Sequence, residues 1–160
     1  MSETTKELVA YCGLYCKDCI RYRNPIMEKA QALLDALTES DFESYVTIKK
    51  NTNRTFENYD RFIEVLRGVV QLRCDQSCRL ADGCPSFECQ ILRCCKEKGY
   101  EGCWECNQLD ACDKFEFLKA MHGDTPKKNC SIIKQHGLRK FEEERYPFYV
   151  WGTSKGATEK

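Results

Sequence analysis

The sequence predicts a mainly α-helical fold with short irregular or β-hairpin metal-binding knuckles, a small helical domain stapled by zinc sites. Apolar residues recur at helical spacing in segments without cysteine. The 13 cysteines of the 160-residue chain are instead concentrated in short segments of loop composition. Period-two alternation of apolar and polar residues is absent, so any β-structure is expected to consist of short hairpins.

Two helices are predicted in the cysteine-free segment 24–73. Asn24 and Pro25 form an N-cap followed by a proline at the first helical position, and a helix is expected over 25–38. A second apolar stripe predicts a helix over 55–70, and the polar stretch 41–54 between them is expected to be a loop with a short turn. We expect these two helices to form most of the core.

The C-terminal part is also expected to be helical. A glycine C-cap closes a short helix at Gly99. Asp113 and Glu116 have the spacing of a capping box and should open a helix that ends at Gly123. Thr125 and Pro126 should begin the next helix, with an interruption at Gly137, and the aromatic run 146–151 should pack back on the body.

These features predict a single cysteine-rich metal-binding domain over residues 1–151. It contains a helical insert at 24–73, a zinc-knuckle region at 74–112 and C-terminal helices over 113–146. Residues 152–160 are expected to form a flexible tail.

Composition narrows the class of protein. Lys+Arg and Asp+Glu both number 25, and zinc held by thiolates would add negative charge, so nucleic acid is disfavoured as a partner. The polar N-terminus lacks the apolar region of a secretory signal, and no stretch is apolar enough to span a membrane. We therefore expect a cytoplasmic protein whose clustered cysteines bind metal or carry out redox chemistry rather than form lasting disulfides.

Cysteine spacing predicts metal ligation. Zinc takes four ligands in a tetrahedron, and cysteines separated by two to four residues can reach one ion through a tight turn. Six pairs in the chain have such spacing: Cys12/Cys16, Cys16/Cys19, Cys74/Cys78, Cys84/Cys89, Cys89/Cys94 and Cys103/Cys106.

Spacing alone does not select the metal, so an iron–sulfur cluster is retained as the alternative cofactor. The first three cysteines also have the spacing of the loop that binds a cluster in radical enzymes. That assignment is disfavoured, because Asp18 stands where an aromatic residue is usual and no succession of strands follows.

Four stretches carry a family resemblance: YCGLYCKDC, FIEVLRGVVQLRCDQSC, CQILRCCKEKGYEGCWEC and HGDTPKKNCSIIKQHGL. In this order they resemble a bacterial and archaeal family known as domain of unknown function 3795. The resemblance implies a small zinc-binding protein without an assigned activity. It also implies the metal ligands, which would be Cys12, Cys16, Cys19, Cys74, Cys78, Cys89, Cys94, Cys103, Cys106 and Cys112.

The partition of these thiols among ions stays open between two and three zinc ions. Cys84, Cys95 or His122 would complete a third site, whereas Cys130 is expected to be a buried apolar side chain. The first three cysteines need a fourth ligand from the later region, which predicts that metal pins the N-terminus to the body.

No catalytic constellation is recognised, so the expected function is that of a cytosolic structural-zinc module that binds a partner, expected to be a protein. The rival hypothesis is a redox or thiol-reactive protein that works through Cys84, Cys95 or an iron–sulfur cluster. A third hypothesis is an enzyme with an open catalytic zinc site. His122 is expected to be a cation at a helix C-terminus, and Trp104 to pack on a knuckle.

Overall fold

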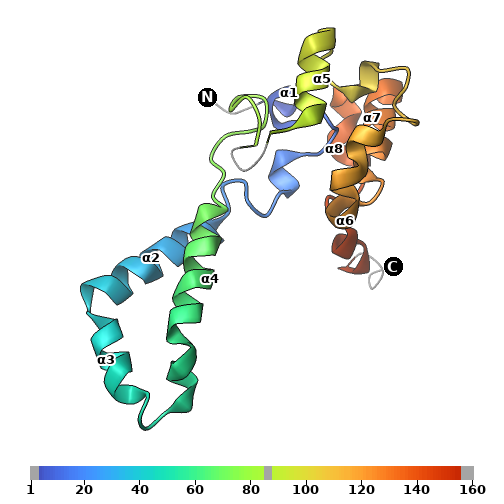
Figure 1. Ribbon diagram of the computed structural model, residues 1–160. Coiled ribbons are helices and arrows are strands. Elements are labelled where there is room, and N and C mark those ends of the chain that lie inside the picture. The colour runs from blue at the N-terminus through green and yellow to red at the C-terminus, as the bar shows by residue number, and fades with distance from the viewer. Residues whose placement is uncertain (1–3, 85–87, 156–160) are drawn as a thin grey trace. The chain divides into compact units, whose positions relative to one another are not determined.

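The structure is a computed structural model that describes residues 4–84 and 88–155, and it is mainly helical (Figure 1). The chain forms two compact units: unit 1 comprises Met1–Tyr22 and Gln76–Lys160, and unit 2 comprises Arg23–Asp75. Within the described ranges β-structure is limited to isolated bridges such as Val9 to Tyr15. The cysteine-rich knuckles are therefore irregular loops and 3-10 turns, and β-hairpins are not formed.

Unit 2 coincides with the predicted helical insert, extended to include Cys74. Its elements are α2 (Pro25–Glu39), α3 (Phe42–Lys49), the 3-10 helix η2 (Arg54–Asn58) and α4 (Tyr59–Gln71). The predicted start of α2 is confirmed, because the Asn24 side chain accepts a hydrogen bond from the N–H of Ile26 at 3.0 Å. Figure 1 shows α2 and α4 lying side by side.

The segment expected to be a loop at 41–54 forms helix α3 instead. Aromatic packing explains the difference: the ring of Phe42 lies 6.0 Å from that of Tyr59 and 6.4 Å from that of Phe56. Polar composition at this segment therefore reflects an exposed helix face rather than irregular backbone.

The prediction that the helices of this insert form most of the core is wrong. Unit 2 buries a small set of side chains between its helices: Met27, Ala30, Val46, Tyr59 and Leu66. The larger buried cluster lies in unit 1, and it includes Leu8, Val9, Tyr15, Ile91, Trp104, Leu109, Phe115, Ile133 and Phe141. Aromatic side chains and buried cysteines supply much of the buried apolar surface of unit 1, which has few branched apolar residues.

Unit 1 is built from short helices and loops. Its elements are α1 (Thr5–Leu8), η1 (Cys16–Asp18), α5 (Gln90–Lys98), η3 (Cys103–Glu105), η4 (Asp113–Leu118), α6 (Lys119–His122), α7 (Thr125–His136), α8 (Leu138–Glu144) and η5 (Val150–Lys155). The sequence analysis did not predict α1, which begins with a capping box between Thr4 and Glu7.

Glycines end two of the helices as predicted. Gly99 closes α5 with φ of 67°, and Gly137 separates α7 from α8 with φ of 74°. Two N-terminal predictions are wrong in detail. Asp113 opens a 3-10 helix without a side-chain cap, and the Thr125 hydroxyl donates to the carbonyl O of Pro147 at 2.8 Å rather than capping α7.

The C-terminal aromatic run packs back on unit 1, as predicted. The Phe148 ring lies 4.7 Å from the His122 ring, and the Tyr149 ring stacks on that of Trp151 at 4.4 Å. The predicted tail at 152–160 starts within η5, and residues 156–160 lie outside the described residues. No helix in 4–84 or 88–155 has the length and apolarity needed to cross a membrane.

Candidate metal centre

The first three cysteines lie on one tight loop. The N–H of Ala10 donates to the carbonyl O of Leu14 at 2.7 Å, and Gly13, with φ of 84°, makes the reversal between them. The loop then enters η1, where the N–H of Cys19 donates to the carbonyl O of Cys16 at 2.9 Å. This backbone places three thiols within one short segment, as their spacing predicts.

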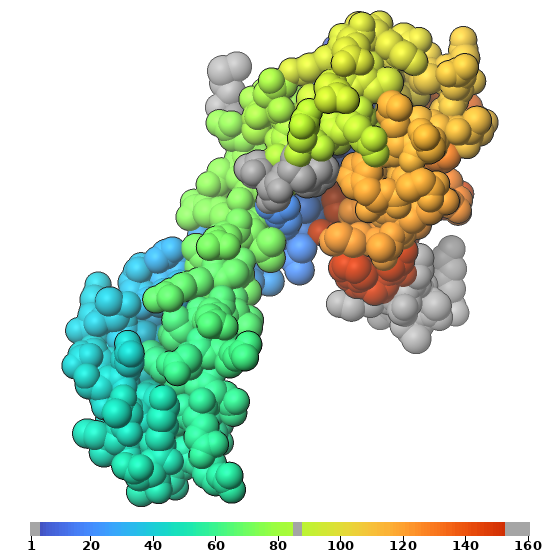
Figure 2. Space-filling view, viewed as in Figure 1, coloured from blue at the N-terminus to red at the C-terminus, as the bar shows by residue number. Residues whose placement is uncertain are grey.

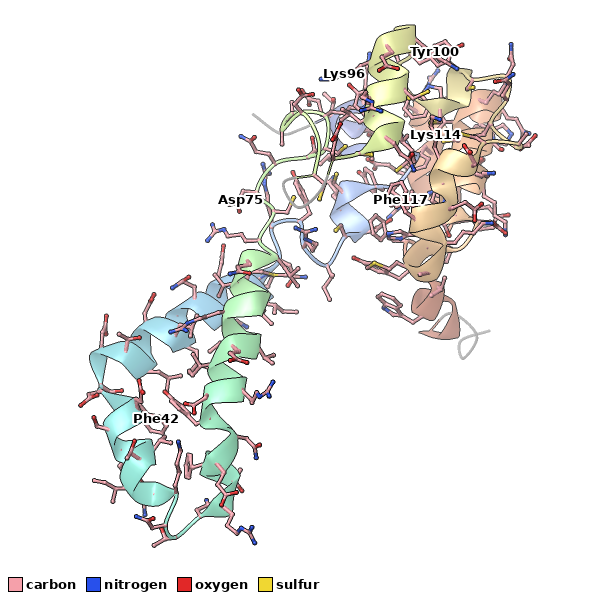
Figure 3. All side chains as sticks on the ribbon, in the orientation of Figure 1. Phe42, Asp75, Lys96, Tyr100, Lys114 and Phe117 are labelled. Carbon is pink, nitrogen blue, oxygen red and sulfur yellow. The ribbon has the colours of Figure 1, made fainter. Side chains whose placement is uncertain are left out.

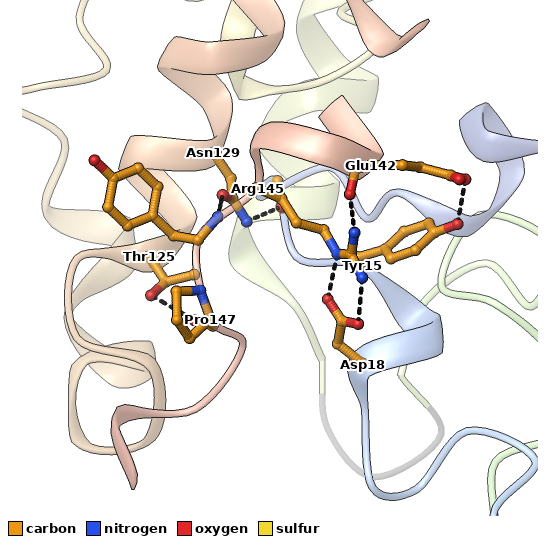
Figure 4. Close-up of polar contacts among 9 residues, drawn as sticks. Tyr15, Asp18, Thr125, Asn129, Glu142, Arg145 and Pro147 are labelled. Atoms are coloured by element: carbon orange, nitrogen blue, oxygen red, sulfur yellow. Dashed lines mark hydrogen bonds and ion pairs between the residues drawn. The ribbon is translucent and has the colours of Figure 1, made fainter. Parts of the chain in front are cut away.

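Polar contacts from the C-terminal helices fix this loop (Figure 4). Arg145 holds Asp18 through two bonds, with Nε to Oδ2 at 2.6 Å and Nη2 to Oδ1 at 2.8 Å. The Tyr15 hydroxyl donates to the carboxylate of Glu142 on α8. Burial, together with this bond, raises the pKa of Tyr15, and the same bond lowers the pKa of Glu142. The loop is thus anchored at several points that do not involve its thiols.

Arg79 joins the loop to two other segments. Its Nε donates to the carbonyl O of Val9 at 2.6 Å, and its Nη2 donates to that of Glu101 at 2.5 Å. The guanidinium also lies 4.4 Å from the ring centroid of Tyr11 and 5.3 Å from that of Trp104. One half-buried cation therefore holds together three of the segments that carry cysteines.

Cys78, next to this arginine in the chain, lies near several other thiols, and we name Cys12, Cys16, Cys78 and Cys89 the loop thiol group. Cys12 lies close enough to Cys78 and Cys89 for electrostatic interaction, and Cys78 interacts in the same way with Cys89, Cys16 and Cys84. Burial, followed by these neighbours, raises the pKa of Cys78 to about 12 and that of Cys12 further. Thiols of the N-terminal loop thus lie near thiols from the middle of the chain.

A second gathering surrounds a cavity of about 380 Å³ in unit 1. Its walls come from α5, η3, η4 and the loop between the last two. We name its cysteines the cavity thiols, which are Cys94, Cys95, Cys103, Cys106 and Cys112. Figure 2 shows α5 in yellow beside the following loop in yellow-orange, and Figure 3 labels Tyr100 and Lys114 of the cavity wall.

Cys95 and Cys103 are in contact, with 3.7 Å between their Sγ atoms. Both are buried, at 2% and 9% exposure. Adjacent side chains on a helix point in different directions, yet Cys94 and Cys95 both line the cavity. The contact between Cys95 and Cys103 has no short spacing in the sequence, because the Gly99 turn joins the two cysteines.

The remaining cysteines are Cys19, Cys74, Cys84 and Cys130. The Tyr149 hydroxyl donates to the Sγ of Cys19 at 3.7 Å, and an Arg21 guanidinium nitrogen lies 3.5 Å from the Sγ of Cys84. Cys130 is fully buried on α7, as predicted. Cys74 belongs to unit 2, where its carbonyl O accepts the N–H of Arg23 at 2.8 Å.

The histidines differ from expectation. His122 is buried at 7% exposure and is not a surface cation; burial lowers its pKa, and its Nδ1 donates to the carbonyl O of Phe148 at 2.5 Å. His136 pairs with Glu144 through its Nδ1. Trp104 is buried against the knuckle, as predicted.

The thiolate donors suit zinc or iron chemically, but their arrangement does not preform a site for a single ion. Within residues 4–84 and 88–155, no three His, Cys, Asp or Glu side chains converge closely enough to hold a metal ion.

A comparison with family models gives one match. The model described as protein of unknown function (DUF3795) matches residues 8–117, more than half of the chain. The chain belongs to the DUF3795 family. No curated protein and no solved structure matches.

The DUF3795 match includes every thiol of both groups and ends within η4. Cys130 and the residues of α7 and α8 that anchor the first loop lie beyond it. The family region thus carries the candidate ligands, and the C-terminal helices supply their support.

Proposed function

We propose that the protein is a structural-zinc module in which Cys12, Cys16, Cys78 and Cys89 hold one ion. The observation that carries the proposal is the mutual proximity of Cys12, Cys78 and Cys89, which come from distant parts of the sequence. Zinc bound there would join the N-terminal loop to the segment around Arg79 and add stability to a region that buries few branched apolar residues.

The arrangement supports a structural role for two reasons. The backbone of the loop is already held by Arg79 and Arg145, so ion binding requires adjustment of thiol side chains rather than folding of the loop. Four sulfur ligands would also close the coordination sphere, whereas catalytic zinc keeps a position for water.

The experiment is zinc analysis of protein purified without added metal. Cys12→Ser and Cys78→Ser should each lose about one zinc per chain relative to wild type, because each removes one ligand of a four-ligand site. Cys130→Ser is the matched control, since Cys130 is a buried thiol on α7 that is not one of the four proposed ligands. Unchanged zinc content in the two ligand variants would refute the loop site.

The partner is proposed to be a protein that binds unit 2. In support, unit 2 exposes large apolar side chains: Ile48 at 72%, Val65 at 67% and Phe62 at 45%. Phe62 and Val65 are three residues apart on α4, so they lie on the same side of that helix, and neighbouring exposed aromatic and aliphatic side chains are typical of protein interaction surfaces.

Proximity labelling in cells can test this surface with Val65→Lys and, as a matched control on the same helix, Glu64→Lys. Neighbours labelled by wild type and by the control but lost with Val65→Lys would support the proposal. Identical labelling by all three proteins would contradict it.

A thiol-redox function is the second candidate, favoured by the 3.7 Å contact between Cys95 and Cys103. A peroxide could oxidise the pair: the two thiols lose two protons and two electrons, an S–S bond forms, and the peroxide O–O bond is reduced to water. Mass spectrometry of peroxide-treated protein should then detect a disulfide between these residues, and its absence would remove this candidate.

A further inference from the structure

The cavity of about 380 Å³ has room for more than one thiolate-bound ion. Four sulfurs at about 2.3 Å from a tetrahedral zinc lie about 3.8 Å from one another and leave no space between them. The cavity volume lies in the range of about 300 to 1,000 Å³ that small-molecule and cofactor sites occupy.

The cavity thiols surround this space from several elements. Cys94 comes from α5, Cys103 from η3, and Cys106 and Cys112 from the loop that follows. They line one cavity, yet among the described residues no three of them converge on the position of a single ion. Cysteine ligands distributed around a cavity suit a polynuclear group, whose metal atoms each take one thiolate.

The remaining cavity wall suits an anionic metal–sulfide group. Ile91, Leu109 and Phe115 are buried and give this partly open cavity an apolar wall. Lys98 and Lys114 also line the cavity, and their positive charge is complementary to a group that carries four thiolates.

From these observations we propose that the cavity binds a four-iron, four-sulfide cluster through Cys94, Cys103, Cys106 and Cys112. We assign Cys95, which also lines the cavity, as a contact to a ligating sulfur rather than as a fifth ligand, because its Sγ lies 3.7 Å from that of Cys103. The proposed ligands are different residues from those of the loop thiol group, and Cys103 lies within electrostatic reach of Cys12.

Anaerobic purification without added metal, followed by reconstitution with ferrous iron and sulfide, tests the wild-type chain. The expected result is about four iron and four acid-labile sulfide per chain, with a broad visible absorption that dithionite bleaches. Zinc in the cavity thiols after anaerobic expression, or failure of the reconstituted protein to retain iron and sulfide, would overturn the proposal.

Two substitutions locate the cluster. Cys112→Ser should lose most of the bound iron and sulfide while keeping the zinc of the loop thiol group. Cys84→Ser is the matched control and should keep the iron and sulfide, because Cys84 lies outside the cavity wall. Equal iron content in Cys112→Ser and wild type would contradict the assignment of Cys112 as a cluster ligand. Zinc lost from Cys12→Ser without loss of iron would concern the loop thiol group alone.

Cys95→Ala provides a readout that does not depend on removing a ligand. It should retain the iron and shift the reduction potential of the cluster, because contacts to ligating sulfurs tune that potential. A potential identical to that of wild type would contradict the proposed contact between Cys95 and a cluster ligand.

Discussion

Asn129 on α7 donates from Nδ2 to the carbonyl O of Gly13 at 2.9 Å, so a buried amide fixes the turn that presents Cys12. Its Oδ1 also accepts the N–H of Tyr146 at 2.8 Å. Asn129→Ala should lower the free energy of unfolding by about 2 to 4 kcal/mol, because two backbone groups lose their partners. Urea denaturation measures the change. Gln31→Ala, which removes an exposed hydrogen bond, should change it by about 0.5 kcal/mol or less.

Gly13 has no room for a side chain. A Cβ there would lie 2.8 Å from the carbonyl O of Pro126 and 2.9 Å from the Sγ of Cys130, and its φ of 84° is unfavourable for other residues. Gly13→Ala should therefore destabilise the protein by about 1 to 3 kcal/mol. The control is Gly68→Ala on α4, where a Cβ meets nothing within 4 Å and helix propensity should rise. Thermal melting that ranks the two variants in the opposite order would contradict this account.

The ion pair between Asp18 and Arg145 should contribute to stability more than an exposed pair. The two side chains are 25% and 28% exposed and form a bidentate contact. A double-mutant cycle with Asp18→Asn and Arg145→Gln should give a coupling energy of about 1 to 2 kcal/mol. The same cycle at the exposed pair of Arg93 and Glu97 should give about 0.3 to 0.5 kcal/mol, and equal couplings would be evidence against anchoring by Arg145.

Acid should destabilise the protein partly through His122. Burial lowers its pKa in the folded state, against opposition from the hydrogen bond to Phe148. Below about pH 6.5 the unfolded chain binds a proton that the folded chain does not, so the free energy of unfolding falls as the pH falls. His122→Asn should make this dependence shallower between pH 7 and 5 in denaturation experiments. An identical slope in both proteins would show that His122 contributes nothing to it.

Local signals in the sequence predicted much of the helical structure. Asn24 and Gly99 act through backbone groups next to them, so their caps could be recognised without tertiary information. The spacing of Asp113 and Glu116 resembled a cap but led to a 3-10 helix, and Thr125 formed a hydrogen bond with distant Pro147. Tertiary partners decided the outcome at these positions.

The sequence predicted which residue types form the candidate site, but it did not predict how those residues group in space. Short spacing predicted that Cys12 and Cys16 lie on one loop, because a few residues fix that geometry. The grouping of Cys12 with Cys78 and Cys89, and the closeness of Cys95 to Cys103, depend on how separate segments pack. Arg79 organises that packing through contacts with backbone carbonyls, which leave no pattern in the sequence.

The most direct test of the central claim is thermal melting of the protein before and after removal of metal by a strong chelator under reducing conditions. If metal held by thiols joins the N-terminal loop to the rest of unit 1, removal should lower the melting temperature by several degrees and zinc with ferrous iron and sulfide should restore it. The same melting temperature and cooperativity in metal-free and metal-bound protein would contradict the claim.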